Sequence, residues 1–217
     1  MSPLFVARME AVLDLYAAPY DPLRPVVCVD EQPLALTAPT RLPLPAHPGQ
    51  LRRADYEYRR CGSCSLFGAF QPLAGWRTVL ARERRTAQDF ANFLRTLVDE
   101  HFPEAQVVRL VLDNLNTHSV AALYTTYPAP EARRLASKLE FHYTPPHGSW
   151  LNMIEIEWSV LVQQCLGRHL PDLASVQVEV DAWTTRRNAE RATVHWRFTS
   201  EQARVTLDHL YPHPPNP

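Results

Sequence analysis

Two aspartates lie at comparable places in two apolar, strand-like segments of the chain. Asp30 follows the β-branched run in PVVCVDEQPLAL, and Asp113 ends the most hydrophobic such segment, QVVRLVLDN. If the two strands are neighbours, their carboxylates converge, and two anions a few ångströms apart repel unless a cation or a proton lies between them. With a third oxygen ligand they would form a site for a hard divalent cation such as Mg²⁺. Two such ions about 3.5–4 Å apart can hold the attacking and leaving oxygens of a phosphodiester, which is the chemistry that these residues indicate.

A third acidic ligand could come from HGSWLNMIEIEW, residues 147–158. Glu155 and Glu157 of this segment would lie about 200° apart around a helix, at about 100° per residue. Only one of them can therefore face a given crevice, and periodicity alone does not say which. The helix itself is predicted from apolar residues at helical spacing, which are Leu151, Ile154, Trp158, Leu161, Val162 and Cys165.

The acidic residues also have a structural interpretation. Asp30 could begin a turn and Asp113 could cap the next helix, and for Asp113 alone capping explains the residue as well as catalysis does. The coincidence of three acidic positions favours catalysis for the set. A zinc hydrolase is excluded because no histidine pair has the spacing of H-E-x-x-H. The pair CGSC, Cys61 and Cys64, has the spacing of half a zinc site, but no second half follows.

The elements that must position these residues follow from hydrophobic periodicity and from turn residues. Their order is strand, antiparallel strands, helix, strand, helix, strand, helix, which predicts a mixed α/β fold with right-handed helical crossovers. Ligands of such sheets bind near the carboxyl ends of parallel strands, where Asp113 is expected. The expected segments are a helix over 3–17, a strand after Pro25, a proline-dense loop over 39–49, antiparallel strands over 56–83, a helix over 86–100, a strand over 106–114, helical stretches over 119–127 and 130–139, a strand over 140–144, a helix over 151–165, and helices over roughly 172–190 and 199–210.

Length and composition limit the remaining possibilities. A chain of 217 residues, 46% of them hydrophobic, can bury one substantial core but hardly two. Its net charge of −1 argues against a protein that coats nucleic acid through overall charge, so any such contact would need a local patch. Neither a secretory segment nor an apolar run of about 18 residues, as a membrane span requires, is present. We therefore expect a cytoplasmic, reduced protein without a membrane partner.

Three segments together resemble the catalytic domain of DDE transposases, in the bacterial insertion-sequence branch related to the mariner elements. They are VVCVDE, LVLDNLNTH and HYTPPHGSWLNMIEIEW, joined by YDPLRPVV, FQPLAGWR, ERRTAQDF and RATVHWRFT. The resemblance implies an RNase H-like fold, with a mixed five-stranded sheet flanked by helices. It divides the chain into a lead-in helix and linker (1–24), a catalytic domain (25–211) and a disordered tail (212–217).

The resemblance also implies a role for individual residues. The family's two catalytic aspartates fall on Asp30 and Asp113, and its Asn-x-x-Glu pattern places the glutamate on Glu155, three residues after Asn152. Glu157 is then a flanking residue on the other side of the helix. The three acidic residues would bind two Mg²⁺ or Mn²⁺ ions. The implied reaction is cleavage of DNA at transposon ends, followed by joining of the 3′ end to target DNA.

Further residues are expected to support this site or to contact DNA. Asn114, His118 and Asn152 are the supporting candidates, and for the first two the alternative is a strand-to-helix turn with an Asn cap. The candidates for DNA contacts are arginines interleaved with tyrosines, a second arginine cluster, and residues before the acidic helix. The arginines could equally line a solvated strand edge, and Trp150 could belong to the core. These candidates are Arg52, Arg53, Arg59, Arg60, Arg82, Arg84, Arg85, His147 and Trp150.

Two other functions fit the same residues. A host nuclease of this fold would cleave nucleic acid without strand transfer, and an inactive transposase remnant would bind DNA or full-length transposase and inhibit it. Members of the family normally carry N-terminal helix-turn-helix modules, whereas one helical segment precedes the first strand here. We therefore expect a split or frameshifted element, an incomplete gene, or part of a longer protein. Such transposases often act as dimers, so a homodimer is also an expectation.

Overall fold

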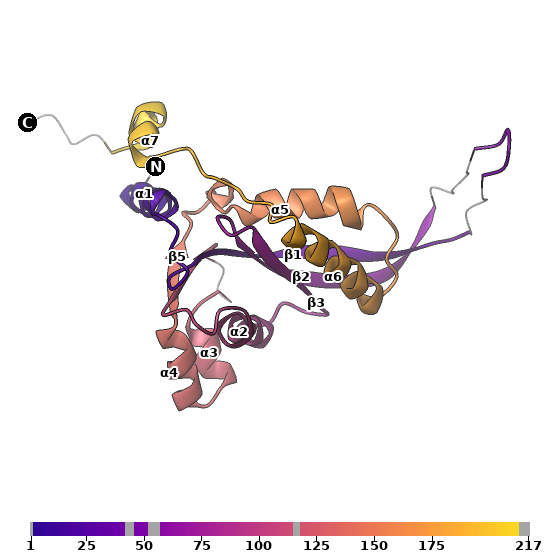
Figure 1. Ribbon diagram of the computed structural model, residues 1–217, viewed down its shortest axis with the longest axis horizontal. Helices are drawn as coiled ribbons and strands as arrows, with labels where there is room; N and C mark the ends of the chain where they lie inside the picture. The colour runs from indigo at the N-terminus through magenta and orange to yellow at the C-terminus, as the bar shows by residue number, and fades with distance from the viewer. Residues whose placement is uncertain (1, 42–45, 52–56, 115–117, 213–217) are drawn as a thin grey trace, which may run out of the picture.

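The computed structural model describes residues 2–41, 46–51, 57–114 and 118–212. Its helices and strands follow the order predicted from the sequence (Figure 1). None of the helices in these ranges is long and apolar enough to cross a membrane. In chain order the elements are α1 (Pro3–Ala17), β1 (Val26–Pro39), β2 (Tyr58–Gln71), β3 (Trp76–Arg82), α2 (Ala87–Thr96), η1 (Leu97–His101), β4 (Val108–Leu112), α3 (Ala121–Thr126), α4 (Ala129–Ser137), β5 (Leu139–Tyr143), η2 (Ser149–Leu151), α5 (Ile154–Leu161), η3 (Val162–Leu166), α6 (Leu173–Ala189), α7 (Ser200–Thr206) and η4 (Asp208–Leu210).

The five strands form one mixed sheet in the order β3-β2-β1-β4-β5. Strands β1, β2 and β3 pair antiparallel as a meander, whereas β1, β4 and β5 run parallel. The parallel strands are joined through helices, as parallel pairing requires. The predicted mixed five-stranded sheet flanked by helices is thereby confirmed, with β1 at its centre.

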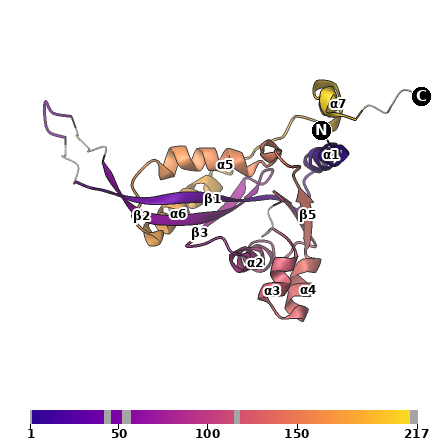
Figure 2. The same ribbon diagram turned by 180° about the vertical axis from the view of Figure 1, so that it is seen from behind.

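Helices cover both faces of the sheet and divide the core into two layers. In Figures 1 and 2, α5 and α6 lie on one side of the sheet and α2, α3 and α4 on the other. Side chains of β1 alternate between the layers, with Cys28 on the α5 side and Val27 and Val29 on the α2 side. This alternation follows from the two-residue period of a strand, and it decides which face each acidic residue of β1 reaches.

The sequence predicts a short, buried strand after Pro25. Strand β1 is longer than this and is only partly buried. It continues through Pro33 to Pro39, while burial is concentrated in its first residues. Of the residues of β1, only Val26–Cys28 pair with β4. The pairing of β2 with β3 extends along β2 only as far as Ser65. The remainder of β1 and β2 therefore extends from the sheet as a two-stranded ribbon (Figure 1). One edge of β1 lacks a strand partner there, which is why a proline is tolerated in it.

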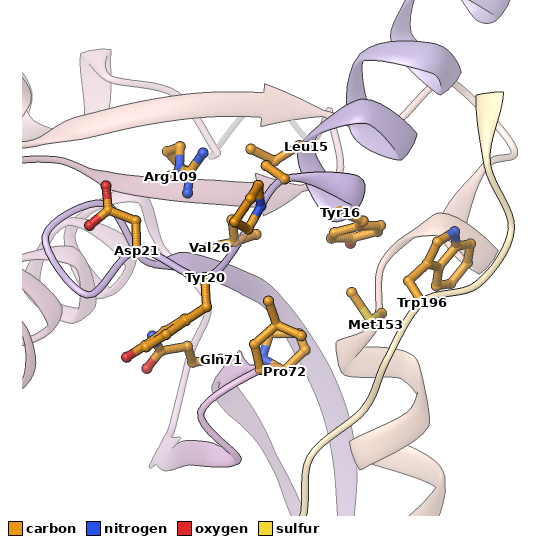
Figure 3. Close-up of a pocket in the computed structure, with 13 residues that line it drawn as sticks. Leu15, Tyr16, Tyr20, Asp21, Val26, Gln71, Pro72, Arg109, Met153 and Trp196 are labelled. Atoms are coloured by element: carbon orange, nitrogen blue, oxygen red, sulfur yellow. The ribbon is translucent and has the colours of Figure 1, made fainter.

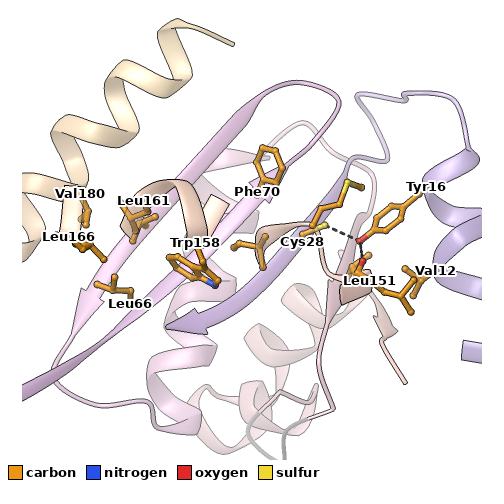
Figure 4. Close-up of a cluster of buried hydrophobic side chains, with 14 of the residues drawn as sticks. Val12, Tyr16, Cys28, Leu66, Phe70, Leu151, Trp158, Leu161, Leu166 and Val180 are labelled. Atoms are coloured by element: carbon orange, nitrogen blue, oxygen red, sulfur yellow. Dashed lines mark hydrogen bonds between the residues drawn. The ribbon is translucent and has the colours of Figure 1, made fainter. Parts of the chain in front are cut away.

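The acidic helix is divided into three pieces. A 3₁₀ turn, η2, precedes α5, and the π-helix η3 continues it. Most of the predicted apolar stripe is buried on the core, as Figure 4 shows for Leu151, Trp158 and Leu161. The prediction is wrong for Val162, which is 45% exposed, because the helix changes from α to π geometry at that residue.

Helix α1 packs on the same core layer as α5. Met9, Val12 and Leu13 are fully buried. The Tyr16 hydroxyl donates a hydrogen bond of 2.7 Å to the carbonyl of Leu151, and it lies 3.3 Å from the Cys28 sulfur (Figure 4). Near its middle the helix meets α7 through an ion pair of 2.8 Å between Glu10 and Arg204. The division of the chain at residue 24 stays a prediction.

Candidate active site

The parallel pairing of β1 and β4 aligns the two aspartates. Cys28 pairs with Val111 in this ladder, so Asp30 and Asp113 both follow two residues later at the carboxyl ends of the paired segments. Cys28 and Val111 belong to the core layer on the α5 side, and residues two apart on a strand share a face. The predicted strand neighbourhood is therefore present: Asp30 is directed to the α5 side, and Asp113 directly follows the last residue of β4.

Helix α5 lies directly over this part of the sheet. Gly68 of β2 is the antiparallel partner of Asp30, and a Cβ atom at Gly68 would come within 2.4 Å of the Trp158 ring. The absence of a side chain is therefore what lets the helix approach. Asn152, just before α5, donates a hydrogen bond of 3.0 Å from its side chain to the carbonyl of Val29. The start of the acidic helix is thus tied to the strand residue that precedes Asp30.

The charges of three acidic residues act on one another at this point. Burial raises the pKa of Asp30 to about 7, and the negative charges of Asp113 and Glu155 contribute to the rise. Burial also raises the pKa of Glu155. These shifts have the sign expected of carboxylates in a poorly solvated site, and the nearby His118 offsets the rise at Asp30 only in part. The negative charges of Asp113 and Glu155 therefore both act on Asp30, whereas the assignment of the three residues to one site stays a prediction.

The three carboxylates suit a hard cation in their chemistry. Mg²⁺ and Mn²⁺ prefer oxygen ligands, and a bound cation would remove the repulsion that raises the pKa of Asp30. In the described ranges, no group of three or more His, Cys, Asp or Glu side chains is placed so that it could hold a metal ion. An incomplete protein cage is compatible with Mg²⁺, which commonly keeps several waters and uses one or two carboxylates together with substrate phosphate.

His118 is buried beneath the aspartates and bonds two acidic residues at once. Its Nδ1 atom hydrogen-bonds Asp113, and its Nε2 atom lies 3.0 Å from a carboxylate oxygen of Glu31. Burial by itself lowers the pKa of His118, but the hydrogen bonds to Asp113 and Glu31 raise it to about 9. The ring is therefore an imidazolium at neutral pH and donates from both nitrogens. Phe90 packs on it at a ring distance of 4.7 Å.

Glu31 was not among the residues expected at the site. Its side chain is 2% exposed, and one of its carboxylate oxygens is buried with no hydrogen-bond partner among the residues that the structure describes. Alternation along β1 directs Glu31 away from the face of Asp30, which was readable from its adjacent position. Its partner was not readable, because His118 comes from the segment after β4, 87 residues further along the chain.

Glu157 lies on the opposite flank of α5 from Glu155, as the predicted angle of about 200° between them requires. It is 3% exposed. One oxygen lies 2.8 Å from Nε of Arg77, and the other accepts a hydrogen bond of 2.9 Å from Arg187. Glu157 is therefore matched by positive charge inside the core, and its carboxylate does not face the aspartates.

The remaining site candidates are scattered over exposed surfaces. Asn114, next to Asp113, is exposed, and His147 is exposed with a left-handed backbone φ of 61°. Trp150 is 44% exposed and stacks on Trp196 at a ring distance of 6.2 Å, so it lies at the edge of the core. Arg52 and Arg53 lie outside the described residues. The other arginine candidates, all exposed, are Arg59, Arg60, Arg82, Arg84 and Arg85.

Two of these arginines differ in their distance from the acidic residues. Arg60 pairs with Thr37 on the ribbon, seven residues from Asp30 and so about 23 Å along the strand. Arg82 pairs with Ser65, which in turn pairs with a residue of β1 only three positions from Asp30. Arg82 therefore lies nearer than Arg60 to Asp30 along the sheet, but the alternation of β3 directs its side chain to the α2 side, opposite Asp30.

A small pocket lies away from the acidic residues, at the amino end of β1 (Figure 3). Tyr16, Tyr20, Val26, Arg109 and Trp196 are among the residues that line it. Its free volume of about 20 Å³ has room for roughly one water molecule. This pocket is therefore too small to hold a substrate.

Comparison with known proteins gives one family match and several structural matches. A family model described as DDE superfamily endonuclease matches residues 25–177. The crystal structure of the Mos1 mariner paired end complex with Mn matches with a TM-score of 0.56 and 16% sequence identity, covering 88% of this chain and 58% of that chain. The Mos1 strand transfer complex matches with a TM-score of 0.49 and 16% identity, covering 88% and 59%. No curated protein matches the sequence.

These comparisons establish the fold and the family. The first Mos1 match confirms the RNase H-like fold, and at 16% identity it shows the fold alone. The chain spans less than two thirds of the length of the Mos1 chains that it matches. The family model covers both aspartates and the acidic helix within a single match. The chain therefore belongs to the DDE superfamily of endonucleases.

Proposed function

We propose that this chain is the catalytic domain of a DNA transposase, which uses divalent metal ions to cleave phosphodiester bonds at transposon ends and to join the 3′ end to target DNA. The observation that supports the proposal is the electrostatic surroundings of Asp30: burial raises its pKa to about 7, and the negative charges of Asp113 and Glu155 contribute to the rise. Two aspartates at the carboxyl ends of paired parallel strands, with a glutamate from α5, would suit the binding of cations.

Asp30, Asp113 and Glu155 would hold two metal ions, either Mg²⁺ or Mn²⁺. When bound, such ions activate a water or hydroxyl nucleophile and offset the charge on the leaving oxygen. Two of the Mos1 structures were solved with Mn and with Mg, which supports the use of these metals here.

Two neighbouring residues would keep the aspartates in place. His118, as an imidazolium, holds Asp113 from below and is itself held by Glu31. Asn152 fixes the backbone of β1 one residue before Asp30. Ligand-orienting hydrogen bonds of this kind typically change metal affinity or activity by 10- to 100-fold when they are removed.

DNA contacts are proposed for the exposed residues around the site. Arg82, Arg84 and Arg85 lie at the end of β3 and beyond it, and Arg59 and Arg60 lie on the ribbon. Arg52, Arg53, His147, Trp150 and Asn114 stay candidates from the sequence. The matching Mos1 structures are a paired end complex and a strand transfer complex. By analogy we propose that two copies of this chain act together on two DNA ends.

A plasmid assay tests the proposed function. The protein is incubated with supercoiled plasmid and labelled duplexes that carry free 3′-hydroxyl ends, in Mn²⁺ or Mg²⁺. A transposase domain is expected to nick the plasmid and to attach the labelled strands to it. Nicking without joining would favour a host nuclease. Neither reaction, in a protein that binds DNA, would contradict the proposal and favour an inhibitory remnant.

A further inference from the structure

A buried cluster of charged residues lies under α5, on the side away from the aspartates. Its members are Arg77 of β3, Glu157 of α5 and Arg187 of α6, and it is called the arginine–glutamate cluster below. The side chains of Arg77 and Glu157 are 1% and 4% exposed, and that of Arg187 is 16% exposed. The Arg77 contact is an ion pair, and the Arg187 contact is a charged hydrogen bond. Three elements of the fold therefore meet at one carboxylate.

Arg77 is itself anchored on several sides, so it gives Glu157 a fixed partner. One guanidinium nitrogen donates to the carbonyl of Ala192, and another donates to the carbonyl of Gly75 at 3.1 Å. Its backbone N–H donates a hydrogen bond of 2.8 Å to the side chain of Asn188. The guanidinium also lies over the Phe70 ring at 5.1 Å. The position of Arg77 is thus set by β2, β3, α6 and the segment after α6.

Helix α5 has few other directional contacts. It spans eight residues, has no side-chain cap at its N-terminus, and continues into a π-helix. Its inner face packs through Ile154, Trp158 and Leu161, and apolar burial of this kind is non-directional. Glu157 is held by charged contacts, which are both stronger and more specific in geometry. Since Glu155 lies about 200° away on the same helix, fixing Glu157 also fixes the direction of Glu155.

We propose that Arg77, Glu157 and Arg187 are positioning residues that set the rotation of α5 and so direct the Glu155 carboxylate to Asp30 and Asp113 for cation binding. This inference rests on the proposed metal site. A buried ion pair adds little stability over apolar side chains of similar volume. Orientation is therefore the property by which the arginine–glutamate cluster affects the site, and it acts through Glu155 alone.

A double-mutant cycle on Mn²⁺ binding tests the proposal, with isothermal titration calorimetry as the readout. The proteins are wild type, Glu155→Gln, Glu157→Gln and the double variant. We expect Glu157→Gln to weaken Mn²⁺ binding by about tenfold or more, the effect typical of residues that orient metal ligands. In the Glu155→Gln background the same substitution should have no further effect, because contacting or coupled residues are non-additive.

A matched control is available on the surface. Glu179 forms an exposed ion pair with Arg168, at 3.1 Å, so Glu179→Gln removes the same charge without touching α5. It should leave Mn²⁺ affinity unchanged. If Glu157→Gln does not fold, Arg187→Gln is used instead, since it leaves the Arg77 contact in place. Arg187→Lys should then restore most of the affinity.

Each outcome decides between the two proposals. Unchanged Mn²⁺ affinity in Glu157→Gln would overturn the inference, and so would an equal loss in the wild-type and Glu155→Gln backgrounds, which would show general loosening. A wild-type protein that binds no Mn²⁺ would instead refute the metal site, and the inference would fall with it. Non-additive loss in a folded protein is the predicted result.

Discussion

The two flanks of α5 carry the same side chain in opposite surroundings. Glu157 is buried against Arg77 and Arg187, which match its charge. Glu155 is partly buried beside two aspartates, and among the described residues it has no ion-pair partner; burial raises its pKa. A buried charge that is matched contributes to the architecture, whereas like charges gathered without a counter-charge oppose folding. Clusters of the second kind mark candidate sites of function.

The largest expected effect is on activity, at the unmatched flank. Glu155→Gln should lower plasmid nicking by about 10³-fold, since a metal ion contributes several kcal/mol to stabilising the transition state. Its free energy of unfolding without metal should stay the same or rise, because the substitution removes a carboxylate whose pKa the fold raises. Nicking rates and urea denaturation measure the two quantities. Full nicking activity in Glu155→Gln would contradict the role of Glu155 as a metal ligand.

The matched flank should show its largest effect in stability. Arg77→Met leaves the buried Glu157 carboxylate with one partner, and breaking a buried ion pair costs about 3–5 kcal/mol of unfolding free energy. Arg168→Met, at the exposed pair with Glu179, should cost within about 1 kcal/mol. Urea denaturation of both variants tests the difference. Equal costs would show that burial of the arginine–glutamate cluster does not matter.

A third substitution sharpens the comparison from the other face of the sheet. His118→Asn removes the imidazolium between Asp113 and Glu31, so Asp113 loses its orienting hydrogen bond. Activity should fall by about 10- to 100-fold, less than for Glu155→Gln. His142, which bonds Glu140 near the protein surface, supplies the control variant His142→Asn. Nicking is measured at saturating Mn²⁺. Equal activity of the two histidine variants would contradict this expectation.

The smallest expected effect concerns DNA contacts. Arg82→Gln should weaken binding to duplex DNA a few-fold and reduce the slope of log K against log salt by about 0.9, the value for one lost phosphate contact. Arg133, an exposed arginine of α4, is the matched control as Arg133→Gln. Fluorescence anisotropy across a salt series gives both slopes. The same slope in both variants would remove Arg82 from the proposed DNA surface.

Much of the fold was predictable because its signals are local. The capping boxes at Thr86–Asp89 and Thr199–Gln202 mark the starts of α2 and α7, and both are present. Because Asp113 ends an apolar segment of the sequence, its place at the carboxyl end of a parallel strand was predictable. The direction of Glu155 followed only from the family resemblance, because periodicity treats the two glutamates alike.

The contacts that distinguish equivalent residue types were not predictable. Arg77 and Arg82 both lie on β3, yet Arg77 is buried because α6 and the segment after it cover that end of the strand. Glu31 reads as an ordinary strand residue, and its importance depends on a histidine 87 residues away. Such differences come from tertiary packing, which no local pattern records.

The central claim is that Asp30, Asp113 and Glu155 bind divalent cations. Crystals of the protein grown with Mn²⁺ and measured near the manganese absorption edge test it most directly, because anomalous scattering locates the metal without reference to activity. The predicted result is one or two anomalous peaks between these three carboxylates, with no peak at Glu157. Manganese bound elsewhere, or no ordered manganese at a concentration that supports nicking, would contradict the claim.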